Sequence, residues 1–171
     1  MRSFALVLLL CACGSAPASV LVGSDAPIVI GAPAMWKFEP ASSGAGIALE
    51  PVTLEQTRAV FALRGKQLGP LHGVAFRVVF DPSVAEFVRY TPSGDWAIAP
   101  LIKVAEVRPG IVVVVVSQHG PTGALAADEL GRIELTLKDS TTASFALERT
   151  IAMGNNGARI DFAWRGGSLR R

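Results

Sequence analysis

The chain has 171 residues, of which 16 are basic and 14 acidic, and half of its residues are hydrophobic. Apart from the pair Arg170-Arg171 the basic residues are scattered, so the charge pattern excludes a nucleic-acid groove. The length is enough for one domain with a sizeable core.

The N-terminal segment has the form of a secretory signal. Arg2 precedes an apolar run that is too short to span a bilayer as a helix. The ending Leu10-Cys11-Ala12-Cys13 resembles the bacterial lipobox, in which an aliphatic residue and two small ones precede the lipidated cysteine. Cys13 follows a small residue and fits this pattern better than Cys11, which follows a bulky leucine. We expect a lipoprotein signal peptide over 1–12 and lipid attachment at Cys13, with an ordinary signal peptide or a buried N-terminal helix as alternatives.

This segment also predicts where the protein is located. It indicates an exported protein that is held at the cell envelope by its lipid, at the outer membrane in a Gram-negative host. No cysteine follows Cys13, so folding of the exported chain requires no disulfide.

Residues 13–46 are expected to form a flexible or partly ordered tether. Prolines and a Ser-Ser-Gly-Ala-Gly cluster interrupt this stretch repeatedly. Short strands fit at 20–22, 28–30 and 35–38, and the aromatic residues of the last segment are expected to dock on the main domain.

From residue 47 onward, short alternating or aliphatic segments separated by turn residues indicate β-strands. The segments are 58–64, 73–80, 84–88, 111–116, 132–138, 144–151 and 158–164. A helical turn fits only at 124–130, and no segment has a sustained period of 3.6 residues. Residues 47–171 are therefore predicted to be all-β, as an antiparallel, jelly-roll-like β-sandwich of about nine strands.

Alternation within these segments predicts the core. The side chains expected to point inward are Val74, Phe76, Val78, Phe80, Ile133, Leu135 and Leu137. The run 111–116 consists of six β-branched residues and is typical of a central strand buried on both faces, or nearly so. Either its even-numbered or its odd-numbered residues are expected to face the core.

The ordered set of segments resembles cohesin modules, the β-sandwich receptors that bind dockerins in cellulosome-type assemblies. The segments that carry the resemblance are 73–88, 111–117, 120–123, 131–138, 152–157 and 166–169. Together they extend over roughly residues 50 to 170. Carbohydrate-binding and immunoglobulin-like sandwiches are the alternatives.

The resemblance implies a dockerin-like protein partner that is bound on one flat sheet face, to which the strand 73–80 contributes. The outward residues of this strand, Ala75, Arg77 and Val79, are the expected partner face, with Arg77 as the anchoring side chain. Cohesins usually present more polar side chains there. The structural alternative is that Arg77 pairs with a neighbouring carboxylate.

No catalytic constellation is found in the sequence, so we expect no enzyme, no cofactor and no metal. His72 and His119 have no metal-ligating residue at a useful spacing. Asp128 and Glu129 are neighbours that fit a solvated turn better than acid–base chemistry.

Tyr90 and Trp96 supply an alternative function. A loop Trp with a Tyr nearby can stack on a sugar ring, although a Trp packed over the end of the sandwich is the commoner arrangement. The sequence thus predicts an envelope-anchored recognition module for a protein partner. A carbohydrate-binding sandwich and a structural envelope lipoprotein are the alternatives.

The lipid anchor can be tested by a single substitution. Because Cys13 supplies the only thiol that the lipobox can lipidate, Cys13→Ser should block processing or release the protein from membrane fractions. Fatty-acid labelling and fractionation measure this. A variant that still labels and still sediments with membrane would contradict lipidation at Cys13.

Overall fold

A computed structural model describes residues 35–41, 46–66, 68, 71–94, 96, 100–118, 128–154 and 156–171. These residues form twelve β-strands, and none of them belongs to a helix long and apolar enough to cross a membrane. The strands predicted at 20–22 and 28–30 lie outside the described residues.

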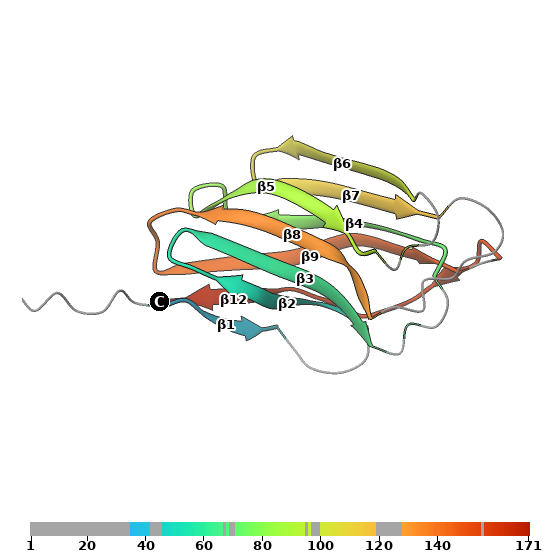
Figure 1. Ribbon diagram of the computed structural model, residues 1–171, viewed down its shortest axis with the longest axis horizontal. Helices are drawn as coiled ribbons and strands as arrows, with labels where there is room; N and C mark the ends of the chain where they lie inside the picture. Colours follow the sequence, from blue (N-terminus) through green and yellow to red (C-terminus); the bar gives the residue numbers. More distant parts are fainter. Residues whose placement is uncertain are drawn as a thin grey trace, which may run out of the picture. The chain divides into compact units, whose positions relative to one another are not determined.

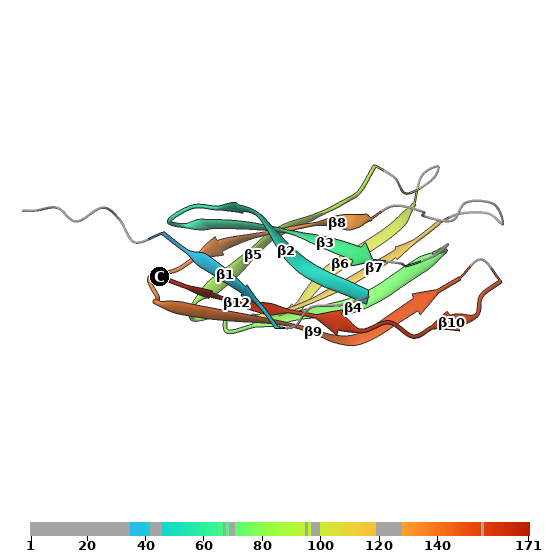
Figure 2. The same cartoon turned by 90° about the horizontal axis from the view of Figure 1, so that it is seen from below.

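The strands form two sheets that face each other, which we call sheet A and sheet B (Figures 1 and 2). Sheet A has the order β1-β12-β9-β4-β7-β6, with β10 beside β9, and sheet B has the order β11-β2-β3-β8-β5. The strands of sheet A are β1 (Lys37–Pro40), β4 (Gly73–Phe80), β6 (Leu101–Arg108), β7 (Ile111–Ser117), β9 (Thr142–Met153), β10 (Arg159–Ile160) and β12 (Gly167–Arg170). Those of sheet B are β2 (Gly46–Leu54), β3 (Arg58–Lys66), β5 (Ala85–Pro92), β8 (Glu129–Leu137) and β11 (Trp164–Arg165). All pairings are antiparallel except that of β11 with β2, so the predicted all-β sandwich is confirmed.

The core lies between the sheets and is built by period-two alternation. The predicted inward side chains of β4 and β8 are all buried, at 5 % exposure or less. Phe76, which is 1 % exposed, contacts the rings of Tyr90 and Trp164 at centroid distances of 6.2 Å and 5.6 Å. Phe61 of β3 packs on Phe145 of β9 across the sandwich at 5.1 Å.

The strand β7 has one buried and one half-buried face. Val112, Val114 and Val116 are fully buried, which settles the choice between the two alternating sets. The odd-numbered residues Ile111, Val113 and Val115 are only half-buried, so burial on both faces was too strong a prediction. The reason is that these side chains point away from sheet B, on the outer surface of sheet A, where Ala75, Arg77 and Val79 of β4 are half-buried in the same way.

The structure has twelve strands in its described part rather than about nine, for two reasons. The edge strand β6 has seven exposed residues out of eight, so its sequence carries no clear alternation. The predicted strand 158–164 is divided, because β10 pairs with β9 in sheet A whereas β11 pairs with β2 in sheet B. The predicted helical turn at 124–130 lies mostly outside the described residues, and Glu129 and Leu130 begin β8.

The segment that begins at residue 35 docks on the sandwich, as expected from its aromatic residues. Trp36 is 5 % exposed and donates a hydrogen bond from Nε1 to the carbonyl oxygen of Gln56 at 3.1 Å. The guanidinium of Arg171 lies 4.5 Å from the centre of the Trp36 ring. Phe38 of β1 packs on Phe61 at 5.3 Å. The first strand of sheet A therefore precedes the boundary predicted at residue 47.

The buried face of β4 can be tested by truncation. Phe76→Ala should lower the free energy of unfolding by about 3–5 kcal/mol, because it leaves a cavity between the sheets. Val113→Ala, on the half-buried outer side of the adjacent strand, is the control and should cost clearly less. Denaturant unfolding measures both values. A loss below about 1 kcal/mol for Phe76→Ala would show that β4 faces the other way.

Candidate functional site

The outer surface of sheet A, formed where β9, β4, β7 and β6 lie side by side, is mostly apolar. We call it the A face and define it by the side chains that point away from sheet B. They are Ser144, Ala146, Glu148, Ile151 and Met153 of β9, Ala75, Arg77 and Val79 of β4, Ile111, Val113 and Val115 of β7, and Leu101, Lys103, Ala105 and Arg108 of β6. The three residues predicted for the partner face lie next to one another at its centre, half-buried on β4.

Cross-strand register fixes the neighbours of these central residues. Ala75 stands between Val115 of β7 and Ile151 of β9. Arg77 stands between Val113 and Glu148. The row through Ala75 is therefore apolar on both sides, and the row through Arg77 carries one positive and one negative charge.

A β-bulge in β9 brings two further apolar residues onto the A face. Before the bulge the inward residues of β9 are odd-numbered, as at Phe145, and after it Ala152 points inward. Arg149, with φ of 46°, lies where the register between β4 and β9 shifts. Because one extra residue exchanges the two sides of a strand, Ile151 and Met153 point outward, at 42 % and 40 % exposure.

The A face is hollowed at the end where β4 begins and β7 ends. A depression of about 370 Å³ lies there. The residues that line it include Ala75, Val115, Ile151, Met153, His72, Gly73 and Ser117. Its lining is apolar apart from His72 and Ser117. A contiguous apolar depression of this kind on a sheet surface is typical of an interaction site.

The charged side chains of the A face have no ion-pair partner in the described part of the chain. Arg77 and Glu148 face each other across β4 and β9, but no Lys or Arg nitrogen of the described residues approaches Glu148 within 4.0 Å. The alternative in which Arg77 pairs with a neighbouring carboxylate is therefore not what the structure shows.

The outer surface of sheet B is the opposite in character, because ion pairs cross it from strand to strand. Glu134 of β8 accepts hydrogen bonds from Arg58 of β3 and Arg89 of β5, both at 2.7 Å. Glu129 accepts one from Arg132 at 2.7 Å and lies 3.2 Å from Arg64. The carboxylates of Glu129 and Glu134 are thus each paired with two arginines within the sheet.

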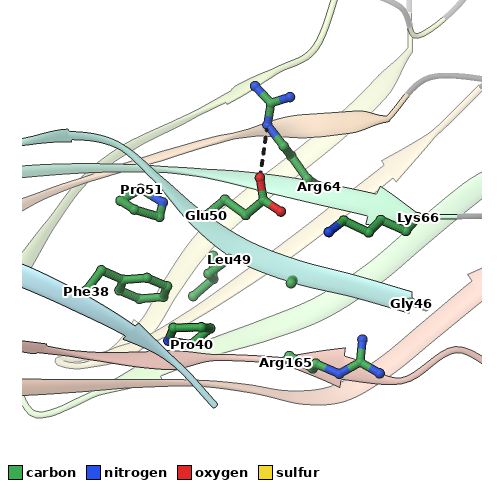
Figure 3. Close-up of a pocket in the computed structure, with 10 residues that line it drawn as sticks. Phe38, Pro40, Gly46, Leu49, Glu50, Pro51, Arg64, Lys66 and Arg165 are labelled. Carbon is green, nitrogen blue, oxygen red and sulfur yellow. Dashed lines mark ion pairs between the residues drawn. The ribbon is translucent and has the colours of Figure 1, made fainter. Parts of the chain in front are cut away.

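A second hollow, of about 350 Å³, lies where β1 approaches β2 (Figure 3). Phe38, Pro40 and Leu49 supply its apolar lining, and the figure shows the side chain of Lys66 reaching toward it from β3. Arg64 at its margin is paired with Glu50 at 3.6 Å. Among the described residues that line the hollow, Arg64 and Glu50 pair with each other, and none is a nucleophile beside a general base.

Tyr90 and Trp96 lie at the end of the sandwich and not on its surface. Both donate a hydrogen bond to the carbonyl oxygen of Leu130, from Tyr90 Oη at 2.9 Å and from Trp96 Nε1 at 2.6 Å. Gly131 permits this arrangement, because a Cβ atom there would lie 2.3 Å from the hydroxyl of Tyr90. Burial raises the pKa of Tyr90, and Trp96 is only 4 % exposed. Their placement argues against the sugar platform, since neither ring is free to stack on a ligand.

The candidate metal and acid–base residues are not brought together. In the described part of the chain no three His, Cys, Asp or Glu side chains are close enough to hold a metal ion. His72 stands opposite Gln118, whose backbone N–H donates to the His72 carbonyl oxygen at 2.8 Å, and His119 lies outside the described residues. The carboxylate of Glu129 is used by Arg132 and Arg64, which accounts for its position without chemistry.

Comparisons with known proteins identify the fold. No family model and no curated protein match the sequence. Solved structures match strongly, and they include the sixth cohesin of Acetivibrio cellulolyticus scaffoldin B, in complex with a Cel5 dockerin mutant. That structure has a TM-score of 0.64 and 12 % identity, and the match covers 74 % of this chain and 97 % of the other. The cohesin module of a Clostridium perfringens family 33 glycoside hydrolase matches with a TM-score of 0.57 and 12 % identity, covering 75 % and 97 %.

A third structure agrees with these two. The type II cohesin domain from the Acetivibrio cellulolyticus cellulosome has a TM-score of 0.60 at 12 % identity, over 75 % of this chain and 95 % of that one. The chain therefore has the fold of cohesin modules, as the ordered strand pattern predicted. The fold is shared although nearly nine residues in ten differ.

Sequence reasoning named only the β4 residues of the A face and missed those that the neighbouring strands contribute, among them the three large exposed apolar side chains Leu101, Ile151 and Met153. Leu101 belongs to the edge strand whose alternation is unreadable, and it is 70 % exposed. Ile151 and Met153 were missed because strict alternation does not register a bulge. The large apolar residues Phe145, Leu147, Ile151 and Met153 are all odd-numbered, so the sequence itself carries no signal that reveals the bulge.

The ion pairs on sheet B predict how stability depends on pH. The pKa of Glu134 is held below its usual range. The largest cause is the hydrogen bond from Arg58, and the hydrogen bond from Arg89 adds to it. Because the folded pKa lies below the unfolded value of about 4.3, this stabilisation is fully present above that pH and is lost as the pH falls through the folded pKa. Glu134→Gln should lower the Tm at neutral pH and reduce the further loss of Tm on acidification.

The matched control is Glu86→Gln, which removes an exposed carboxylate that has no ion pair in the described part of the chain. Thermal unfolding between neutral and acidic pH measures both variants. Equal pH profiles for Glu134→Gln and the unmodified protein would contradict the stabilising role of this carboxylate.

Proposed function

We propose that the protein is an envelope-anchored recognition module that binds a protein partner of the dockerin type through the A face. The observation that carries the proposal is the contrast between the two outer surfaces of the sandwich. On sheet B most charged side chains are joined in ion pairs centred on Glu129 and Glu134, whereas the A face presents apolar rows around Arg77 and Glu148, which have no ion pair in the described part of the chain. An exposed surface that is largely apolar and whose central charges lack ion pairs within the described chain is the better candidate for binding a partner.

The partner class is supported by the fold. Cohesin structures similar to this chain include complexes with dockerins. The apolar depression beside Ala75 and Val115 suits an aliphatic side chain of the partner, and Arg77 suits a carboxylate next to it. Glu148, on the other side of Arg77, suits a basic residue. No catalytic role is proposed, because binding accounts for this surface.

The location is part of the same proposal. The lipobox at Leu10-Cys11-Ala12-Cys13 supports attachment at Cys13, and the tether would then present the sandwich at the envelope surface. Two or three acyl chains hold a protein firmly at a membrane, whereas one gives marginal binding. The A face would be available to partners outside the membrane.

Binding through the A face can be tested with two matched substitutions. Ile151→Asp places a charge in the apolar depression of the A face. The control Val52→Asp places a charge on β2 of sheet B instead. The exposed fractions of the two native side chains are closely similar, 42 % for Ile151 and 44 % for Val52. We expect the full chain carrying Cys13→Ser to capture its partner from an extract of the native organism. Ile151→Asp should abolish this capture and Val52→Asp should retain it, as quantified by mass spectrometry.

The charged row supplies a second pair of variants for the same assay. Arg77→Glu should also abolish capture, whereas Lys66→Glu, a charge reversal on β3 of sheet B, should leave it unchanged. Denaturant unfolding curves serve to check that each variant is folded. Equal recovery of every captured protein by all four variants would exclude the A face as the binding surface.

A further inference from the structure

The free margin of sheet A differs from the other sheet edges. In the described part of the chain the edge strands are β1 and β6 in sheet A and β11 and β5 in sheet B. Three of them are blunted: β1 has four residues and ends in Pro40, β11 has two residues, and β5 has a bulge between Phe87 and Arg89 and ends in Pro92. In contrast, β6 has eight residues and keeps a regular register with β7 from Leu101 to Glu106.

The strand β6 is also exposed on both of its sides. Figure 1 shows it at the margin of the sandwich, beyond β5. Ile102 and Glu106 point to the same side as the buried residues of β7, yet both are exposed, because sheet B does not extend beneath them. Leu101 and Val107 are 70 % and 58 % exposed. A long, regular and partly apolar edge leaves backbone N–H and C=O groups free to pair with another strand.

We propose that this edge pairs with the same edge of a second copy of the chain, antiparallel and centred on Val104. In such a pair the two-fold axis is perpendicular to the sheet, so outer side chains meet outer ones and inner side chains meet inner ones. Val104 then stands opposite its own copy, and Ile102 stands opposite Glu106 of the second copy. On the outer side Lys103 meets Ala105 of the second copy.

The charges of β6 favour this register over its neighbours. A pair centred on Lys103 would place two lysines opposite each other, and one centred on Glu106 would place two glutamates opposite each other. Like charges directly opposite are destabilising. Centring on Val104 opposes no like charges and keeps all paired residues from Ile102 to Glu106 within the regular part of the strand, whereas centring on Ala105 would oppose Lys103 to Val107 beyond it.

The pairing has a consequence for binding. A two-fold axis perpendicular to the sheet leaves the two A faces pointing the same way, in one continuous surface. The strand β1 lies at the far margin of sheet A from β6, so β1 takes no part in the junction. Two equivalent faces side by side would bind a partner that carries two modules with higher avidity than one face. This consequence rests on the proposed function, whereas the pairing itself does not.

Cysteine cross-linking tests the register. In the full chain with Cys11→Ser and Cys13→Ser, Val104→Cys supplies the only thiol. Directly opposed residues of antiparallel strands are about 4.5–5.5 Å apart at Cα, within the range of a disulfide. The matched control is Ala105→Cys, whose two copies would be about 8 Å apart, beyond that range. Mild oxidation should convert Val104→Cys to a covalent dimer much faster than Ala105→Cys.

A charge pair at Ile102 tests the same register without a covalent bond. Opposite Glu106 of the second copy, Ile102→Lys should retain the dimer, and Ile102→Glu should dissociate it. The two dimer dissociation constants should differ on the order of tenfold, because the contact occurs twice across the axis. Sedimentation velocity over a range of protein concentrations measures them.

The outcomes separate this pairing from the proposed function. Selective oxidation of Val104→Cys together with the Lys-against-Glu difference supports the dimer. A protein that stays monomeric, equal oxidation of the two cysteine variants, or equal behaviour of Ile102→Lys and Ile102→Glu overturns it. None of these results depends on a partner protein, so failure of the dimer leaves the capture experiment on the A face unaffected.

Discussion

The packing of the inward side chains of β4 between the two sheets fixes the rest of the sandwich. Phe76 is buried against the rings of Tyr90 and Trp164. Burial of a phenylalanine side chain contributes about 3 kcal/mol or more to the free energy of unfolding at most core sites. A one-residue slip of β4 would move Phe76 to the surface and Arg77 into the core. The same constraint therefore sets both the interior of the protein and the outward position of Arg77.

The outer surfaces of the two sheets differ in how their charged side chains are paired. On sheet B, each carboxylate of Glu129 and Glu134 is shared between two arginines from neighbouring positions, so the surface is satisfied internally. On the A face, the bulge at Arg149 adds apolar side chains next to Ala75. Exposed ion pairs individually add little to the free energy of unfolding, so their main effect on sheet B is to keep its outer surface polar. The A face differs because its apolar rows lack such a network.

Much of the fold could be predicted from the sequence, because alternation of apolar residues is a local signal. The inward sets of β4 and β8 and the outward position of Arg77 were predicted correctly from it. The cohesin-like fold was predicted from the resemblance of the ordered segments to that family, and the solved structures confirm it. The docking of Trp36 was also expected, since an aromatic residue near a domain gains stability by burial. In β7 the local signal left two alternatives, and only the position of sheet B decided in favour of Val112, Val114 and Val116.

The rest could not be predicted because it depends on non-local neighbours. An edge strand such as β6 has no buried face to impose alternation, and a bulge such as that at Arg149 exists only relative to its partner strand. The packing of Trp96 over the end of the sandwich was given as the commoner arrangement, but its hydrogen-bond partner, the carbonyl of Leu130 34 residues away, was not predicted. The surface contrast was likewise hidden, because Arg58, Arg89 and Glu134 come from three separate strands.

The central claim is that the A face and not sheet B contacts the protein partner, and site-specific photo-cross-linking tests it most directly. A photoreactive amino acid at Val113, at the centre of the A face, is compared with one at Thr136, exposed on the outer side of β8. Illumination of the full chain with the native extract should give a partner adduct from position 113 and none from position 136. An adduct from position 136 alone, or equal adducts from both, would contradict the account.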